Sequence, residues 1–234
     1  MKKIIKKILL IIPIIILVIV GIYLNTYYKA DKSVYDLIKN SNVDIKENKD
    51  GYLFDGEGED NFIVFYPGAK VEAIAYTPLL IELASNDIDC YLVKMPFNIA
   101  ILNSNAADKI IKNYKYKNYY MMGHSLGGAM ASVYTSNNED KINGLILLAA
   151  YSTEKIKKVN TLSIYGDKDN VLNKENYNKN KNNINNITEY IIEGANHSGY
   201  AYYGEQKGDN KANISKEEQI NETSNIIIDF VKER

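Results

Sequence analysis

The sequence contains little cysteine and little histidine: Cys90 is the single cysteine, and His124 and His197 are the two histidines in 234 residues. One cysteine excludes an intramolecular disulfide and a metal site built from several cysteines. Cys90 lies in an apolar run, and we interpret it as a small buried residue. With two histidines, the choice of a general base for any acid–base chemistry is narrow.

The chain also lacks an excess of charge, because 28 basic residues stand against 29 acidic ones. Four of the lysines, Lys2, Lys3, Lys6 and Lys7, precede residue 8, so the rest of the chain is mildly acidic. An acidic body has no electrostatic reason to bind a polyanion, and we expect no nucleic-acid partner. The stretch 174–186 is rich in Asn and Lys and is interpreted as a solvated helix and loop rather than a basic interaction patch.

An uncharged and mostly apolar run, residues 8–24, follows the N-terminal lysines. As a helix it would be roughly 25 Å long, which suits a thin bilayer core, and the lysines would stay in the cytoplasm. We therefore expect residues 1–30 to form one transmembrane helix, a signal anchor in the cell membrane, with residues 31–234 as an extracytoplasmic domain. The alternative is secretion after signal cleavage, although the bulky residues that end the run do not resemble a cleavage site.

From residue 61 onward, short apolar runs alternate with helical patterns, which is typical of a mainly parallel sheet with helices on both faces. The expected strands are residues 62–66, 90–93, 119–123, 142–150, 161–166 and 188–192, and the expected helices are residues 73–84, 106–114, 127–135 and 216–231. Ahead of them, residues 31–39 are expected as a short helix, and residues 43–47 and 51–55 as a hairpin. The pattern predicts an α/β fold.

One segment combines an apolar strand, the sequence Gly-x-Ser-x-Gly and a helix that begins with small residues. This is the context of a nucleophile elbow, in which a serine at a sharp strand-to-helix turn takes a strained backbone conformation. Ser125 is therefore the predicted nucleophile. Because the first N–H groups of a helix have no intrahelical partner, the N–H of Leu126 is the predicted donor to an oxyanion formed there.

A serine hydroxyl is a weak nucleophile until a base takes its proton. His124 adjoins Ser125 and should point away from it, so we expect it to pack or to form a supporting hydrogen bond. His197, in the loop after the last expected strand, is the predicted base. Asp167 and Asp169 follow the preceding expected strand, and either could be the acid that orients the imidazole.

From about residue 61 to its end the sequence resembles the α/β-hydrolase superfamily, with dienelactone-hydrolase-like and small esterase-like bacterial members the most similar in layout. The resemblance rests on residues 123–128 and on the segments 66–71 and 199–209. It implies a sheet of the α/β-hydrolase type and the chain order serine, acid, histidine.

The resemblance also selects among the candidate site residues. In this family the acid lies in a Gly-x-x-Asp-x-x-Val-like turn, which favours Asp169 over Asp167. The second oxyanion donor comes from the loop after the first parallel strand, which implies Ala69, with Lys70 as the reserve.

The segment between the strand ending near residue 150 and the one starting near residue 161 is too short for a lid domain, so we expect an open site for small or exposed acyl substrates. The sequence thus predicts a serine hydrolase of the carboxylesterase type. Ser125, His197 and Asp169 would cleave a small-molecule ester through an acyl-enzyme, with no metal or organic cofactor. Thioester cleavage, acyl transfer or peptide cleavage would use the same residues. The rival from another class is a catalytically silent, membrane-anchored binding protein.

Overall fold

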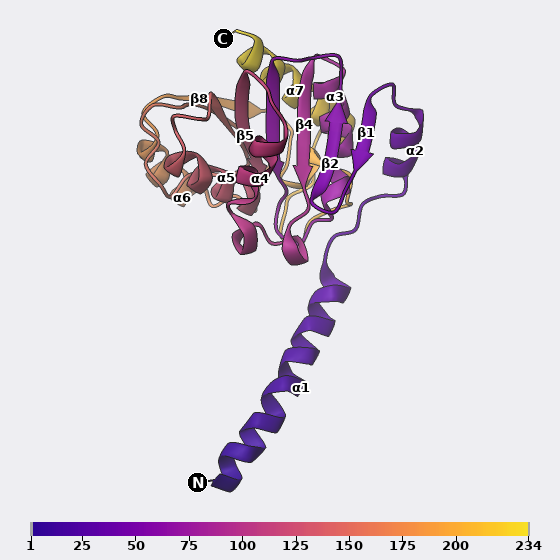
Figure 1. Cartoon of the computed structure of the whole chain (residues 1–234), viewed down its shortest axis with the longest axis vertical. Coiled ribbons are helices and arrows are strands. Elements are labelled where there is room, and N and C mark those ends of the chain that lie inside the picture. The colour runs from indigo at the N-terminus through magenta and orange to yellow at the C-terminus, as the bar shows by residue number, and fades with distance from the viewer. Residues whose placement is uncertain (1, 234) are drawn as a thin grey trace.

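A computed structural model describes residues 2–233, with the side chains of residues 2–8, 24 and 25 outside the description. Its helices are α1 (Lys2–Thr26), α2 (Ser33–Asn40), α3 (Thr77–Ala84), α4 (Ala106–Asn113), α5 (Leu126–Asn137), α6 (Lys174–Asn180) and α7 (Lys216–Lys232) (Figure 1). Its strands are β1 (Asp44–Glu47), β2 (Gly51–Asp55), β3 (Asn61–Tyr66), β4 (Ile88–Val93), β5 (Asn118–His124), β6 (Gly144–Leu148), β7 (Asn160–Gly166) and β8 (Ile187–Ile192).

The strands form one eight-stranded sheet in the order β1-β2-β4-β3-β5-β6-β7-β8. β1 and β2 form an antiparallel hairpin, and β2 pairs antiparallel with β4. From β4 to β8 every pairing is parallel. The carboxyl ends of β3, β5, β6, β7 and β8 therefore meet at one edge, which is where ligands bind in sheets of this kind.

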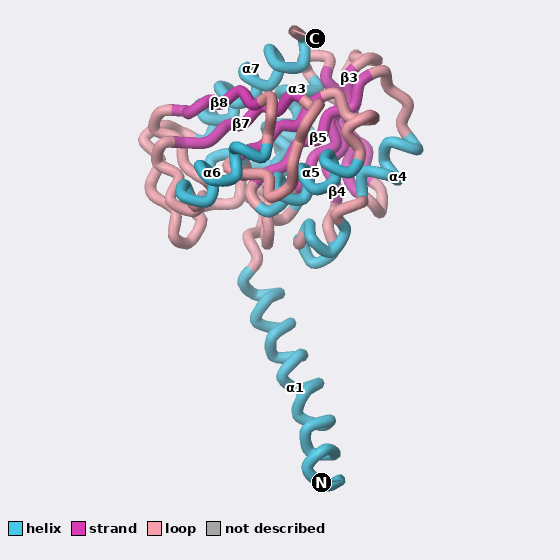
Figure 2. Tube along the Cα trace, turned by 90° about the vertical axis from the view of Figure 1, so that its left-hand side faces the viewer, coloured by secondary structure: helices cyan, strands magenta, loops and turns pink. Residues whose placement is uncertain are grey.

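Helices cover both faces of this sheet (Figure 2). α3 and α7 pack against each other on one face, over a core that includes Leu79, Leu80 and Ile227. α4 and α5 cover the other face, where Ile110 and Ala131 are buried. Because β3 and β4 are covered on both faces, nearly all their residues are buried, as their continuous apolar sequences require.

The sequence predicted these elements closely, and the mainly parallel sheet is confirmed. Two differences have local causes. The expected helix 73–84 is a 3-10 turn, Ala73–Tyr76, followed by α3, because Pro78 in the first turn of α3 has no N–H for a continuous helix. The expected strand 142–150 is shorter at both ends, since Ala149 turns away from the sheet with φ 47°.

The prediction of an N-terminal transmembrane helix is wrong on the residues that the structure describes. The segment is helical, as α1, and extends away from the sheet (Figure 1). Within the described part of the chain, no helix combines the length and the apolar character needed to cross a membrane. The side chains of the lysine cluster lie outside the description.

Candidate active site

Ser125 is the single residue between β5 and α5, and its backbone angles are φ 53° and ψ −123°. This conformation is strained for a residue with a side chain, and it persists because the flanking elements are held closely together. A Cβ on Gly127 would lie 2.1 Å from the carbonyl oxygen of Tyr66, and one on Gly123 would lie 2.5 Å from the backbone of Gly127. Only glycine at these two positions allows α5 to approach β3 and β5, so the strand, turn and helix expected from the sequence are present.

Asp169 and His197 form a buried pair at the ends of β7 and β8. Oδ2 of Asp169 lies 2.8 Å from Nδ1 of His197, and both side chains are almost completely buried. The other carboxylate oxygen of Asp169 accepts hydrogen bonds from the backbone N–H groups of Val171 and Leu172, each at 2.8 Å. Each oxygen therefore has a partner, and the turn after β7 fixes the direction in which the carboxylate faces His197.

Asp167 does not contact His197. One of its oxygens accepts a hydrogen bond from the N–H of Gly194 at 2.6 Å, and the other lies 3.0 Å from Nζ of Lys168. The Lys168 ammonium and the Gly194 N–H lower the pKa of Asp167, because both stabilise the charged carboxylate. Asp167 thus fastens the loop that leads to His197.

The loop carrying His197 has a second anchor on α7. Oε1 of Gln219 accepts a hydrogen bond from the N–H of Asn196 at 3.1 Å, and Nε2 of Gln219 donates to the Asn196 carbonyl at 2.9 Å. Gln219 is fully buried, and a Cβ on Gly199 would lie 1.9 Å from it. The amide of Gln219 thus replaces a missing strand partner for the backbone next to His197.

The loop after β3 lies beside Ser125 and offers one free backbone donor. The N–H of Gly68 donates to Oη of Tyr76 at 3.0 Å, and the N–H of Lys70 donates to the Asn98 carbonyl at 2.8 Å. Among the described contacts, the N–H of Ala69 between them donates to no group. Ala69 is therefore the available donor on this loop, whereas Lys70, the reserve candidate, is occupied.

His124 points away from Ser125, as the sequence predicted for the residue before the nucleophile. Its Nδ1 lies 2.7 Å from Oη of Tyr76, and its ring centroid lies 4.6 Å from that of His197. Burial, with the neighbouring His197 as a smaller cause, holds the pKa of His124 well below its usual value. Burial raises the pKa of Tyr76 as well. Both groups are therefore neutral near pH 7.

Ser125 and His197 open into the same cavity, of about 390 Å³. Its other walls are mostly apolar and come from α5, from the segment after β6 and from the turn after β7, with Leu126, Ala129, Met130, Ala149, Ala150, Tyr151, Thr153, Val171, Leu172 and Asn173 as the lining residues. No Lys, Arg, Asp or Glu side chain is among these described lining residues. Residues 149–159, between β6 and β7, form a loop without a helix, so no lid covers the cavity from there.

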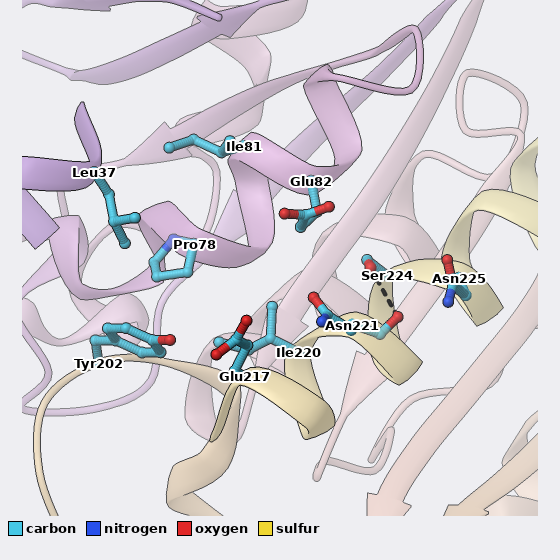
Figure 3. Close-up of a pocket in the computed structure, with 10 residues that line it drawn as sticks. All are labelled: Leu37, Pro78, Ile81, Glu82, Tyr202, Glu217, Ile220, Asn221, Ser224 and Asn225. Carbon is cyan, nitrogen blue, oxygen red and sulfur yellow. Dashed lines mark hydrogen bonds between the residues drawn. The ribbon is translucent and has the colours of Figure 1, made fainter. Parts of the chain in front are cut away.

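A separate cavity, of about 510 Å³, lies between α2, α3 and α7 (Figure 3). Glu82 and Glu217 line it together with the apolar side chains of Pro78 and Ile220. It is larger than the cavity at Ser125 but contains none of the candidate catalytic side chains. Across the residues that the structure describes, no group of three or more His, Cys, Asp and Glu side chains could hold a metal ion.

The sequence matches the alpha/beta hydrolase family over residues 62–221, so the chain belongs to this family. The protein is therefore a hydrolase by class. No curated protein matches it. The matches do not assign the chain to the dienelactone-hydrolase-like subgroup, which stays a prediction.

Several solved structures share the fold at low sequence identity. An alpha/beta hydrolase enzyme from the metagenome of lagoon sediments at Mar Chica, Morocco, is 16% identical with a TM-score of 0.62, over 82% of this chain and 99% of that one. The naproxen esterase (carboxylesterase NP) of Bacillus subtilis is 12% identical with a TM-score of 0.60, over 85% and 96% of the two chains. The monoacylglycerol lipase of Paleococcus ferrophilus is 14% identical with a TM-score of 0.58, over 75% and 95%. At these identities the likeness shows the fold alone.

Sequence reasoning missed two residues that shape this site, Tyr76 and Gln219. Tyr76 comes from a 3-10 turn before α3, and Gln219 comes from α7 near the C-terminus. Neither lies in a motif, and each contacts residues distant in sequence. The sequence signal that could have pointed to Gln219 is a polar residue that interrupts the apolar face of α7, because a buried polar side chain needs a hydrogen-bond partner.

Proposed function

We propose that the protein is a serine esterase in which Ser125 is the nucleophile, His197 the general base and Asp169 the acid that orients His197. The single observation that carries the proposal is the buried Asp169–His197 hydrogen bond of 2.8 Å beside a serine with φ 53°. One carboxylate oxygen of Asp169 holds the turn after β7 through two backbone N–H groups, and the other is left for His197. Its value lies in directing an imidazole.

The direction of the hydrogen bond between His197 and Asp169 supports the roles assigned to these two residues. A carboxylate can only accept, so the neutral His197 donates its Nδ1 proton to Asp169, and its Nε2 is left with a lone pair. Nε2 of His197 is buried and has no hydrogen-bond partner among the described residues. In catalytic sites without substrate, the hydrogen bond between the nucleophile and its base is often long, and it tightens when substrate binds. Nε2 is thus free to take the hydroxyl proton of Ser125.

The reaction then proceeds in two acyl-transfer steps. Oγ of Ser125 attacks the ester carbonyl carbon while His197 takes its proton, and the carbonyl electron pair moves to the oxygen. The N–H groups of Leu126 and Ala69 stabilise that oxyanion. Its collapse breaks the bond to the alcohol oxygen, which receives the proton from His197. Water, deprotonated by His197, attacks the acyl-enzyme in the same way and releases the acid.

The acyl group of the substrate is proposed to be uncharged and of modest size. The cavity at Ser125 holds about 390 Å³, and its walls are mostly apolar, with no Lys, Arg, Asp or Glu side chain among the described lining residues. A charged acyl group would lose its hydration there without gaining a partner. Each buried CH₂ would contribute about 0.8 kcal/mol, or roughly a factor of four in kcat/KM, until the acyl chain exceeds the cavity.

A fluorophosphonate probe and a graded series of p-nitrophenyl esters, from acetate to dodecanoate, test this proposal on the full chain. The full chain is needed because Tyr28 pairs with Val71 next to the proposed oxyanion loop, and a truncation at Asp31 would remove this contact. We expect labelling at Ser125, and turnover that rises with chain length and then falls. Ser125→Ala should abolish both. The absence of labelling and turnover in the folded wild-type protein would instead support a silent binding protein.

The location of the hydrolase outside the cytoplasm remains a separate proposal, in which the N-terminal lysines and the apolar run after them act as a secretory signal. A reporter fused after residue 234 that is active only in the cytoplasm would contradict it.

A further inference from the structure

A chain of three buried polar groups connects the loop after β3 with the loop after β8. The N–H of Gly68 donates to Oη of Tyr76 at 3.0 Å, and Oη lies 2.7 Å from Nδ1 of His124. Tyr76 and His124 are both fully enclosed, and the other side of the His124 ring faces the ring and backbone of His197. The groups come from three separate elements, so their alignment is a feature of the fold rather than of a local motif.

The direction of the protons in this chain follows from the first donor. Because Gly68 donates to the Tyr76 oxygen, the hydroxyl proton of Tyr76 is directed to the other neighbour, Nδ1 of His124. A neutral imidazole that accepts at Nδ1 carries its proton on Nε2. Nε2 of His124 is buried and has no hydrogen-bond partner among the described residues, and the His124 ring packs against the ring of His197 with a centroid distance of 4.6 Å. The order is therefore Gly68 to Tyr76 to His124 by hydrogen bonds, and His124 meets His197 by ring contact.

We propose that Tyr76 and His124 are positioning residues, which hold the oxyanion loop and the backbone of the base in fixed relative positions through this relay. The proposal rests on the proposed function, since it assumes that Ala69 and His197 act in the reaction. Neither Tyr76 nor His124 touches the substrate. Their contribution is to hold both arms of the site before substrate arrives, so that no reorganisation is needed as charge develops.

The topology explains why such a relay is needed. β8 is three strands away from β5 in the sheet order, a distance of about 14 Å at 4.8 Å per strand. The loop bearing His197 must therefore return across the sheet edge to reach Ser125. Asp167 and Gln219 fasten the backbone of Gly194 and Asn196, which precede His197 in this loop. Among the described contacts, the ring of His124, at the end of β5, is the group that contacts His197 on the side of Ser125.

The close approach at Gly68 shows how tightly the relay is built. A Cβ at this position would lie 2.8 Å from Nδ1 of His124 and 2.9 Å from Oη of Tyr76. The backbone of the oxyanion loop therefore packs directly on the two polar side chains, with no room for a methyl group. His124 also remains uncharged next to a base that becomes cationic during the reaction, which avoids repulsion between the two rings.

The first test of the relay locates the ring protons of the two histidines by NMR, in the full-length protein labelled with ¹⁵N in histidine. With two histidines in the chain, the ring nitrogen signals are readily assigned with the aid of His197→Asn. We expect opposite tautomers: the proton on Nε2 in His124 and on Nδ1 in His197. In Tyr76→Phe the chemical shift of His124 Nδ1 should change, while that of His197 Nδ1 should stay the same. A proton on Nδ1 of His124 in the wild-type protein would overturn the relay, whatever the enzyme hydrolyses.

The kinetic test compares Tyr76→Phe with Tyr134→Phe, a matched removal of one buried hydroxyl. Tyr134 of α5 donates to Asp108 of α4 at 2.9 Å, and among the described contacts it has none with the relay. We expect kcat to fall about ten- to a hundredfold in Tyr76→Phe with KM within about twofold, and both constants to stay near the wild-type values in Tyr134→Phe.

A second variant covers the case in which Tyr76→Phe loses its fold. His124→Asn retains an acceptor for Tyr76 but lacks the nitrogen that faces His197, so it should lower kcat in the same way. Equal kcat in the relay variants and in Tyr134→Phe would overturn the positioning role. If the wild-type protein neither hydrolyses esters nor reacts at Ser125, the proposed function fails, while the tautomers of the two histidines still decide whether the relay exists.

Discussion

Replacing Asp169 by Asn separates the orienting role of this carboxylate from its structural role. The amide is nearly the same size, and its oxygen can still accept from the N–H groups of Val171 and Leu172, which lie 2.8 Å from Oδ1 of Asp169. Its NH₂ group would then face Nδ1 of His197 in place of the acceptor. The turn after β7 therefore keeps its hydrogen bonds, and the change is confined to the imidazole.

The cost to catalysis follows from the tautomer that the amide imposes. An NH₂ donor at Nδ1 favours the neutral His197 with its proton on Nε2, where it cannot accept the proton of Ser125. The imidazolium formed in the transition state also loses its negatively charged partner. We expect kcat to fall by about 10³- to 10⁴-fold, which is roughly 4 to 5.5 kcal/mol of transition-state stabilisation. The melting temperature should change little.

Asp167→Asn is the matched control, two residues away in the same turn. Its amide oxygen can still accept from the N–H of Gly194, and the ion pair it loses is with a partly exposed lysine, which contributes little. We expect kcat within about threefold of the wild-type value. Initial rates with an activated ester, together with fluorophosphonate labelling rates and thermal melting, measure all three proteins. Equal losses in the two variants, or a loss in Asp167→Asn alone, would refute the assignment of Asp169 as the orienting acid.

Three further outcomes follow from the packing around the site. Gly127→Ala should lower the free energy of unfolding by about 3 kcal/mol or more, measured by urea denaturation, because its Cβ would meet the backbone of β3 at 2.1 Å; an unchanged midpoint would show that α5 can move aside. Met130→Ala should enlarge the cavity at Ser125 and move the optimum of the ester series to an acyl chain two or three carbons longer, at roughly fourfold per CH₂; an unchanged optimum would place the acyl group elsewhere. Burial raises the pKa of the Cys90 thiol, so Ellman's reagent should find no reactive thiol in the native protein and one after unfolding in urea; rapid reaction of the native protein would contradict the burial of β4.

The strands could be predicted from the sequence because the sheet is covered on both faces. A strand buried on both sides reads as an unbroken apolar run, and β3, β4, β5 and β7 each lie within two residues of the predicted bounds. The sharp turn at Ser125 was predictable for a related reason. A strained serine between a strand and a helix requires small neighbours, and that requirement leaves a local signature at Gly123 and Gly127.

The remainder of the site has no local signature. The residues alone left Asp167 and Asp169 open, and only the resemblance to a family turn favoured Asp169, because which of the two faces His197 depends on the direction of that turn. Tyr76 lies 48 residues before the histidine that it contacts. The prediction of an N-terminal transmembrane helix rested on the hydropathy of residues 8–24 alone, and it failed because no helix in the described part of the chain is long and apolar enough to cross a membrane.

The order of the strands explains both the site and its need for support. The loop after β3, the proposed nucleophile after β5, the proposed acid after β7 and the proposed base after β8 all lie at the carboxyl edge of parallel strands. β6 separates the nucleophile from the acid, and the segment that follows it supplies Ala149 and Tyr151 to the cavity wall instead of a reacting group. The strand that lies between the reacting groups therefore creates the space for the substrate. The same spacing obliges His197 to reach back from the sheet margin, which makes the fixed contacts of Gln219, Asp167 and His124 part of the proposed active site's construction rather than incidental packing.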